Sequence, residues 1–355
     1  MENTSKYTRV MSVIQLRIDK GDYLLRTIPG ERKIAKETGV SYMTARRAVT
    51  ELVKKKILIR RPNGALEPHP DYSKRTVESN IALLCPSFPS PHLARLCWIV
   101  ESAIKQQESM LRPVHYVHWD DPIVYEALSQ AKGALVIPST DAVPSRILPI
   151  MKANKVVVLD GNLAEEGIPS IQLFPKAHIE QVLKYLTELG HRRIDCVNAQ
   201  HENPEIDRRI ALWRQWLLDH NCTGKLWSNP APSFADATQY AYDMMCRVID
   251  EGKVTATAII GTTYPATIAT VRALWERGRS IGKDISVCAI NVEQHSSFYC
   301  PAITGLDIPD LSRVLTQCFD WFGNDSDAVW SDKPLLEPHE PRLVIGESCG
   351  KAAPR

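Results

Sequence analysis

Residues 28–52 read IPGERKIAKETGVSYMTARRAVTEL, and this stretch decides the fold of the first part of the chain. A short helical pattern ends at Gly39, and Glu31 lies in its first turn, where the helix dipole favours an acid. Ser41 is a suitable N-cap for a following helix over 42–55. One apolar stripe at helical spacing runs along that second helix: Ala45, Ala48, Val49 and Leu52. The stretch therefore predicts two helices joined by a tight turn.

The segments on either side extend this pattern. Upstream, residues 7–19 carry apolar residues at close to helical spacing. Downstream, Ile57–Arg61 is typical of a short strand, and the turn Pro62-Asn63-Gly64 can reverse it into a hairpin. Three helices followed by a β-hairpin are the layout of a winged helix-turn-helix, in which the third helix lies in the major groove of DNA.

The charge of the chain is unevenly distributed. The net charge is +2, but residues 1–75 hold 17 Lys and Arg against 8 Asp and Glu, whereas the remaining 280 residues hold 26 against 33. A small basic segment beside a larger acidic one indicates contact with a polyanion. We therefore expect the lysines at 54–56 and the wing arginines to neutralise phosphates.

Residues 6–68 resemble the DNA-binding domain of the GntR family. The resemblance rests on residues 28–32, 34–35, 39–41, 44–48, 52 and 59–61, which match in order and at the right spacing. It implies contacts with DNA from Arg32, Ser41, Thr44, Arg46 and the wing tip. We expect these further residues to take part: Tyr42, Arg47, Arg61, Asn63 and Gly64. Because Tyr42 replaces a frequent Arg and residues 65–68 depart from the usual wing, the operator sequence stays open.

The chain changes character after a polar linker at 69–80. Short apolar runs, such as 81–85, 156–159 and 285–290, alternate with longer amphipathic stretches. Strands alternating with helices predict parallel sheets covered on both faces, an α/β fold that binds ligands beyond the carboxyl ends of its strands.

Residues 80–349 resemble the effector-binding domain of the LacI/GalR repressors, which is similar to periplasmic sugar-binding proteins. The matching segments are 185–194, 281–287, 301–304 and 344–348. The resemblance implies two doubly wound parallel-sheet subdomains with the ligand in the cleft between them. We accordingly expect a DNA-binding domain at 1–68, a linker at 69–80 and an effector-binding and dimerisation domain at 81–349.

The residues of this chain at the positions of the family's effector pocket match those of the family only in part. The family's sugar-contacting arginine falls on Arg209, and an acidic position falls on Asn291. Tyr264 and Phe174 stand at or near positions where the family has carboxylates, and Ser87 and Phe88 are further candidates. The effector is therefore left open between a sugar and a less polar metabolite, and the site could also have lost its effector.

The sequence offers no convincing catalytic, metal or cofactor site. Residues 346–350 match the pattern GxSxG, but no Asp or His follows them, as a hydrolase of that type requires. His115 and His118 are spaced so that a strand would point them to opposite faces. The tryptophans at helical positions are expected in the core: Trp213, Trp216 and Trp275.

We therefore expect a non-enzymatic, cytoplasmic transcription regulator. In the families that the chain resembles, repression is commoner than activation. The regulator would bind a double-stranded operator as a homodimer and respond to a small molecule. The polar start and the lack of a long apolar run predict neither a secretory signal nor a membrane span, and nine scattered cysteines suit reduced thiols. Two alternatives remain: a winged head fused to a catalytic α/β domain, and a dimeric DNA-binding protein without an effector.

Overall fold

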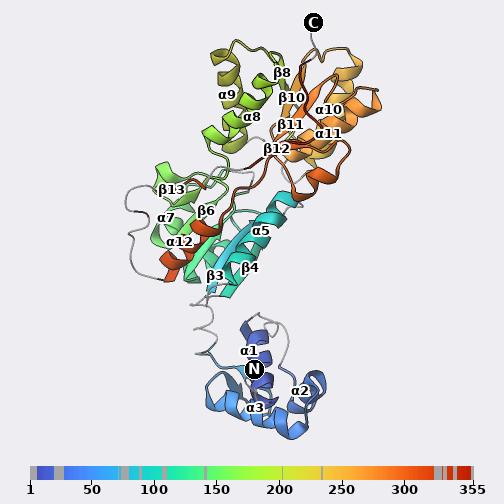
Figure 1. Cartoon of the computed structure of the whole chain (residues 1–355). Coiled ribbons are helices and arrows are strands. Elements are labelled where there is room, and N and C mark those ends of the chain that lie inside the picture. The colour runs from blue at the N-terminus through green and yellow to red at the C-terminus, as the bar shows by residue number, and fades with distance from the viewer. Residues whose placement is uncertain are drawn as a thin grey trace.

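Figure 1 shows a small head and a larger body of two lobes. The structure is a computed structural model, and it describes residues 6–19, 28–70, 72, 80–87, 90–105, 110–139, 142–201, 203–232, 235–323, 330, 334–338 and 342–352. Most of the expected linker, including 73–79, lies outside the described residues.

The head is a winged helix-turn-helix. Its elements are α1 (Lys6–Asp19), α2 (Glu31–Thr38), α3 (Tyr42–Lys54), β1 (Leu58–Arg60) and β2 (Leu66–Pro68). The helix α2 ends at Gly39, whose φ of 65° is readily adopted only by a residue without a Cβ. The two strands pair antiparallel, with Leu58 opposite Pro68. The expected apolar stripe of α3 is fully buried against α1 and the hairpin.

The first lobe of the body is an all-parallel six-stranded sheet in the order β13-β7-β6-β5-β3-β4. The strands are β3 (Asn80–Pro86), β4 (Met110–Tyr116), β5 (Gly133–Val136), β6 (Val156–Leu159), β7 (Ser170–Ile171) and β13 (Leu335–Leu336). One face packs against α5 (Pro91–Ile104) and α12 (Ser312–Gly323), and the other against α6 (Pro122–Gln130) and α7 (Leu148–Ala153). A short 3-10 turn, Ala164–Glu166, precedes β7.

The second lobe has the same architecture, with the strand order β14-β12-β11-β10-β8-β9. The strands are β8 (Ile194–Asn198), β9 (Leu226–Ser228), β10 (Ala258–Gly261), β11 (Ser286–Asn291), β12 (Thr304–Leu306) and β14 (Leu343–Val344). All neighbours are parallel except β12 and β14. The covering helices are α8 (Lys176–Glu188) and α9 (Pro204–Asp219) on one face, and α10 (Ala237–Asp250) and α11 (Tyr264–Glu276) on the other.

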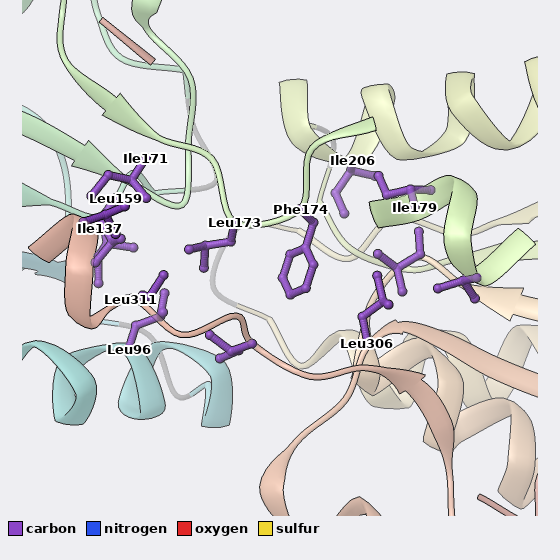
Figure 2. Close-up of a cluster of buried hydrophobic side chains, with 14 of the residues drawn as sticks. Leu96, Ile137, Leu159, Ile171, Leu173, Phe174, Ile179, Ile206, Leu306 and Leu311 are labelled. Carbon is purple, nitrogen blue, oxygen red and sulfur yellow. The ribbon is translucent and has the colours of Figure 1, made fainter. Parts of the chain in front are cut away.

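The chain crosses between the lobes after β7, after β12 and after β13. Figure 2 shows that Leu173 and Phe174, on the first crossover, lie between a group of apolar side chains from the first lobe and another from the second. These groups belong to one continuous buried cluster. The crossovers therefore carry the hydrophobic core from one lobe into the other.

The predicted fold is confirmed, with one error in the core. Trp213 and Trp216 are buried as expected, but Trp275 is 59% exposed. The helix α11 packs through small residues and Leu274, so the neighbouring Trp275 faces outward, where the Arg272 guanidinium lies 4.9 Å from its ring centroid. No helix among the described residues is both long and apolar enough to cross a bilayer.

Candidate functional site

The outer face of α3 carries exposed polar and cationic side chains. Arg46, Arg47 and Thr50 are exposed on the side opposite the buried stripe, and Tyr42 and Met43 are exposed at the start of the helix. This is the geometry of a recognition helix, whose N-terminal residues contact base edges.

Ser41 has a structural role that fits its predicted place at the DNA surface. Its hydroxyl accepts a hydrogen bond from the Thr44 amide at 3.2 Å and lies 2.8 Å from the Thr44 hydroxyl. The side chain thereby satisfies one of the free amides at the start of α3. Arg32, on α2, is exposed.

The wing tip is held by its own side chains. The Asn63 side-chain oxygen accepts a hydrogen bond from the Ala65 amide at 3.0 Å, and Gly64 has a φ of 81°. Arg61 donates to Glu67 at 2.8 Å and remains exposed. The Arg61 guanidinium therefore already has a carboxylate partner within the wing.

The base of the wing is joined to α2 by an ion pair between Arg60 and Glu31. Burial raises the pKa of Glu31, but the hydrogen bond from Arg60 and the charges of Arg60 and Arg46 outweigh it and lower the pKa. The glutamate therefore stays ionised and holds Arg60 in an ion pair.

A second polar cluster lies where the carboxyl ends of strands from both lobes meet. Arg209, on α9, is 7% exposed and donates to the Thr262 carbonyl at 2.7 Å and to the Asn291 side-chain oxygen at 3.5 Å. Its guanidinium carbon lies 5.5 Å from the centroid of the Phe174 ring. The structure thus brings together three residues predicted from the sequence: Phe174, Arg209 and Asn291.

The fourth predicted residue, Tyr264, begins α11 two positions after Thr262 and is buried. Its ring makes edge contacts with His295 and Tyr299, at centroid distances of 6.1 Å each. Tyr264, His295 and Tyr299 therefore form an aromatic group at the start of α11.

Sequence reasoning missed the carboxylate of this site. Asp160 follows β6 directly, and one of its oxygens lies 2.7 Å from His92 Nε2 at the start of α5. Burial raises the pKa of Asp160, but His92, Arg209 and Arg208 together lower it below its ordinary value. An acid immediately after the apolar run 156–159 is the signal that could have found it, because ligands bind beyond the carboxyl ends of parallel strands.

Further contacts tie the first lobe to the second lobe and to the crossovers. Arg95, on α5, donates to Asp307 at 2.6 Å and to the Val292 carbonyl at 3.4 Å. Gln172, on the first crossover, donates to Glu205 at 3.1 Å. Burial raises the pKa of Glu293, although the charges of His92 and Arg95 act in the opposite direction. The lobes are therefore joined by polar contacts as well as by the apolar core.

Several buried polar atoms of this cluster have no hydrogen-bond partner within the described part of the chain. They are His92 Nδ1, Arg95 Nε, Arg209 Nε and Thr263 Oγ1. Buried polar groups are rarely left unpaired in folded proteins. Their concentration between the lobes indicates a site for a polar molecule.

Two predicted pocket residues remain, Ser87 and Phe88. Ser87 is exposed at the end of β3, where its amide donates to the Tyr116 carbonyl at 2.7 Å. Phe88 lies outside the described residues.

The serine of the GxSxG pattern has a structural role. Ser348 is fully buried, donates to the Val287 carbonyl at 2.6 Å and accepts from the Thr304 amide at 2.9 Å. His115 is exposed on β4, and His118 lies beyond its end. Among the described residues, no three His, Cys, Asp or Glu side chains gather as a metal site would need.

Comparisons with known proteins agree with both parts of the structure. Residues 6–67 match the bacterial regulatory proteins of the gntR family, and residues 183–311 match the periplasmic binding protein-like domain. Among curated proteins, none matches the chain.

Solved structures of LacI-family regulators share the fold at low identity. One from Bifidobacterium animalis subsp. lactis is 17% identical, with a TM-score of 0.64 over 78% of this chain and 99% of its own. The lac repressor dimer bound to operator and an anti-inducer is 17% identical, with a TM-score of 0.65 over 77% of this chain and 94% of its own.

A third structure, from Weissella paramesenteroides with bound sucrose, is also 17% identical, with a TM-score of 0.64 over 77% of this chain and 99% of its own. At this identity the similarity shows the fold of the body.

Proposed function

We propose that this chain, which joins a GntR-type DNA-binding head to a LacI-like body, is a cytoplasmic transcription repressor controlled by a small, neutral, sugar-like molecule. Residues 1–68 bind the operator, and residues 81–349 bind the effector and a second copy of the chain. The polar cluster between the lobes is the single observation that carries the effector part of this proposal.

The chemistry of that cluster favours hydroxyl groups. The Arg209 guanidinium is a donor, and the Asp160 carboxylate, close enough for Arg209 to lower its pKa, is an acceptor. A hydroxyl can accept from the first and donate to the second at the same time. Asp160 thus supplies a carboxylate to the cluster, although Tyr264 and Phe174 stand at or near positions where the family has carboxylates. This carboxylate supports a sugar-like effector over a less polar one.

Residues from both lobes make up the cluster, so ligand binding would favour the arrangement in which the lobes are together. A ligand shifts such an equilibrium only by as much as it prefers one arrangement. The resulting change in the body would alter how two heads are presented to an operator, which is a coupling between two sites.

The proposed homodimer would use the outer face of α5. Trp98 is 59% exposed there and lines a groove of about 230 Å³ together with Ile99, Ala103, Pro309 and Leu315. A large exposed aromatic beside an apolar groove is typical of a protein interface. Two-fold symmetry is the commonest arrangement and would match an inverted repeat in DNA.

The effector part of the proposal is tested with the full-length protein. Thermal unfolding is measured with glucose, sucrose and lactose, with gluconate as an acid and with benzyl alcohol as a less polar probe. We expect at least one neutral sugar to raise the melting temperature, because a ligand that binds only the folded state stabilises it. A rise with benzyl alcohol or gluconate alone would contradict the proposed class, and no rise with any probe would contradict the proposed site.

The dimer is tested separately with Trp98→Asp. We expect analytical ultracentrifugation to show the parent as a dimer and the variant as a monomer with weaker operator binding. The matched control is Trp275→Asp, at an equally exposed tryptophan on α11. A dimeric Trp98→Asp variant would rule out the α5 face.

A further inference from the structure

An open groove of about 580 Å³ lies in the head between the first turn of α1 and the outer face of α3. Lys6 and Tyr7 line it from α1, and the side chains from α3 are Met43, Thr44, Arg46, Arg47, Thr50 and Glu51. Three cations against one acid give this lining a net positive charge. The groove is therefore suited to an anion.

One contact in the groove has no role in the core of the head. The Arg47 guanidinium carbon lies 4.3 Å from the centroid of the Tyr7 ring, although Arg47 is exposed. The Tyr7 side chain also packs against the head's hydrophobic core. Tyr7 is thus a fixed platform on which the guanidinium rests.

This platform restricts a side chain that would otherwise be mobile. An arginine loses rotamer freedom when it binds, and a flat guanidinium stacks on an aromatic face where an ammonium does not. An arginine that is already held in place loses less on binding. Stacking also leaves the edge of the guanidinium, which carries its N–H donors, free to pair with an oxyanion.

We propose that this groove holds a phosphate of the DNA backbone, that Arg47 and Lys6 neutralise it, and that Tyr7 is the positioning residue for Arg47. The inference rests on the proposed function in one respect, namely that the head binds DNA. It assigns α1 to the DNA-binding surface and gives Arg47 a different task from Arg46. Arg47 contributes affinity for any duplex, whereas Arg46 reads bases.

The test compares two duplexes of equal length, an operator obtained by selection from random sequences and an unrelated sequence. Binding of the full-length protein to each is measured over a range of salt concentrations. We expect Arg47→Gln to weaken both complexes by similar factors and to reduce the slope of log K against log salt by about 0.9, the value for one phosphate.

Tyr7 is tested through Arg47. Tyr7→Leu keeps the apolar contact with the core but removes the ring face, and we expect a loss of about two- to fivefold, the range of an exposed cation–π contact. Tyr7→Phe should recover that loss. In the Arg47→Gln background, Tyr7→Leu should have no further effect. Melting curves verify that each variant folds, and Arg9→Gln, on α1 but outside the groove, is the matched control for removal of a cation.

Each outcome decides a separate point. If Arg47→Gln weakens only the operator complex, or leaves the salt slope unchanged, the phosphate contact is wrong. If Tyr7→Leu has the same effect with and without Arg47, Tyr7 does not act through it. If the parent protein binds neither duplex, the proposed function itself fails.

Discussion

The head exposes arginine side chains to solvent, whereas the body buries one. Arg46 and Arg47 are exposed on one face of a single helix, whereas Arg209 is 7% exposed and lies among residues from several strands and helices. An exposed cation is weakened by salt and suits a long polyanion, whereas a buried one is screened much less and suits a small enclosed ligand. The difference shows how one chain can separate DNA binding from effector binding.

The largest effect expected from this comparison is at Arg209. Arg209→Ala should weaken binding of the neutral sugar that stabilises the parent by about 2–5 kcal/mol, because it removes a buried charged donor. Binding to DNA should not change. Isothermal titration measures the first and fluorescence anisotropy the second. Arg214→Ala, an exposed arginine on the same helix, is the control, and equal losses in the two variants would remove Arg209 from the site.

The corresponding change in the head is Arg46→Ala. We expect a loss of about 1–3 kcal/mol in operator binding if Arg46 makes a bidentate base contact, together with relaxed sequence preference at one position. Footprinting at fixed salt gives the affinity. Unchanged operator affinity would contradict the assignment of α3 as the recognition helix.

Matched substitutions at two helix caps allow the head and the body to be compared. Ser41 caps α3 and Ser90 caps α5, where it accepts from the Leu93 amide at 3.4 Å. Each Ser→Ala variant should lose about 1 kcal/mol of stability. Only Ser41→Ala should also weaken DNA binding. Denaturant unfolding and anisotropy test both statements, and weaker DNA binding by Ser90→Ala would undermine the separation of the two regions.

The smallest effect is a pH dependence specific to the body. The folded state lowers the pKa of Asp160, so its ionisation stabilises the fold above the ordinary aspartate pKa of about 3.9. This stabilisation is lost as the pH falls through the lower, folded-state value. Asp160→Asn, which tolerates the φ of 62° at this position, should therefore show a shallower loss of stability in acid. Urea unfolding at a series of pH values is the measurement, and parallel curves would show that Asp160 is not held ionised by its neighbours.

The head could be predicted almost completely from the sequence because its structure is set by local signals. The cap at Ser41, the glycine at 39 and the apolar stripe of α3 all lie within 14 consecutive residues. The alternation of strands and helices predicted the parallel sheets of the body, whereas its division into two lobes was implied by the resemblance to the LacI/GalR repressors. The exposed Trp275 was misplaced because helical spacing alone does not say which face of α11 meets the sheet.

The effector site could be predicted only in part because it is assembled from distant segments. Arg209, Asn291 and Phe174 were found by resemblance, whereas His92 and Asp160, 68 residues apart, had no match to suggest that they meet. Tyr7 was missed for the same reason, since its partner Arg47 lies on another helix. Such pairings depend on how the elements pack, which a single sequence does not show.

The central claim is that a ligand in the body controls the head, and one titration tests it most directly. The affinity of the full-length protein for its selected operator is measured by fluorescence anisotropy with and without the sugar that stabilises it most. We expect the Kd to change by at least about fivefold, the lower end of ordinary allosteric coupling. The same Kd with saturating sugar and without it would show that the body does not control the head.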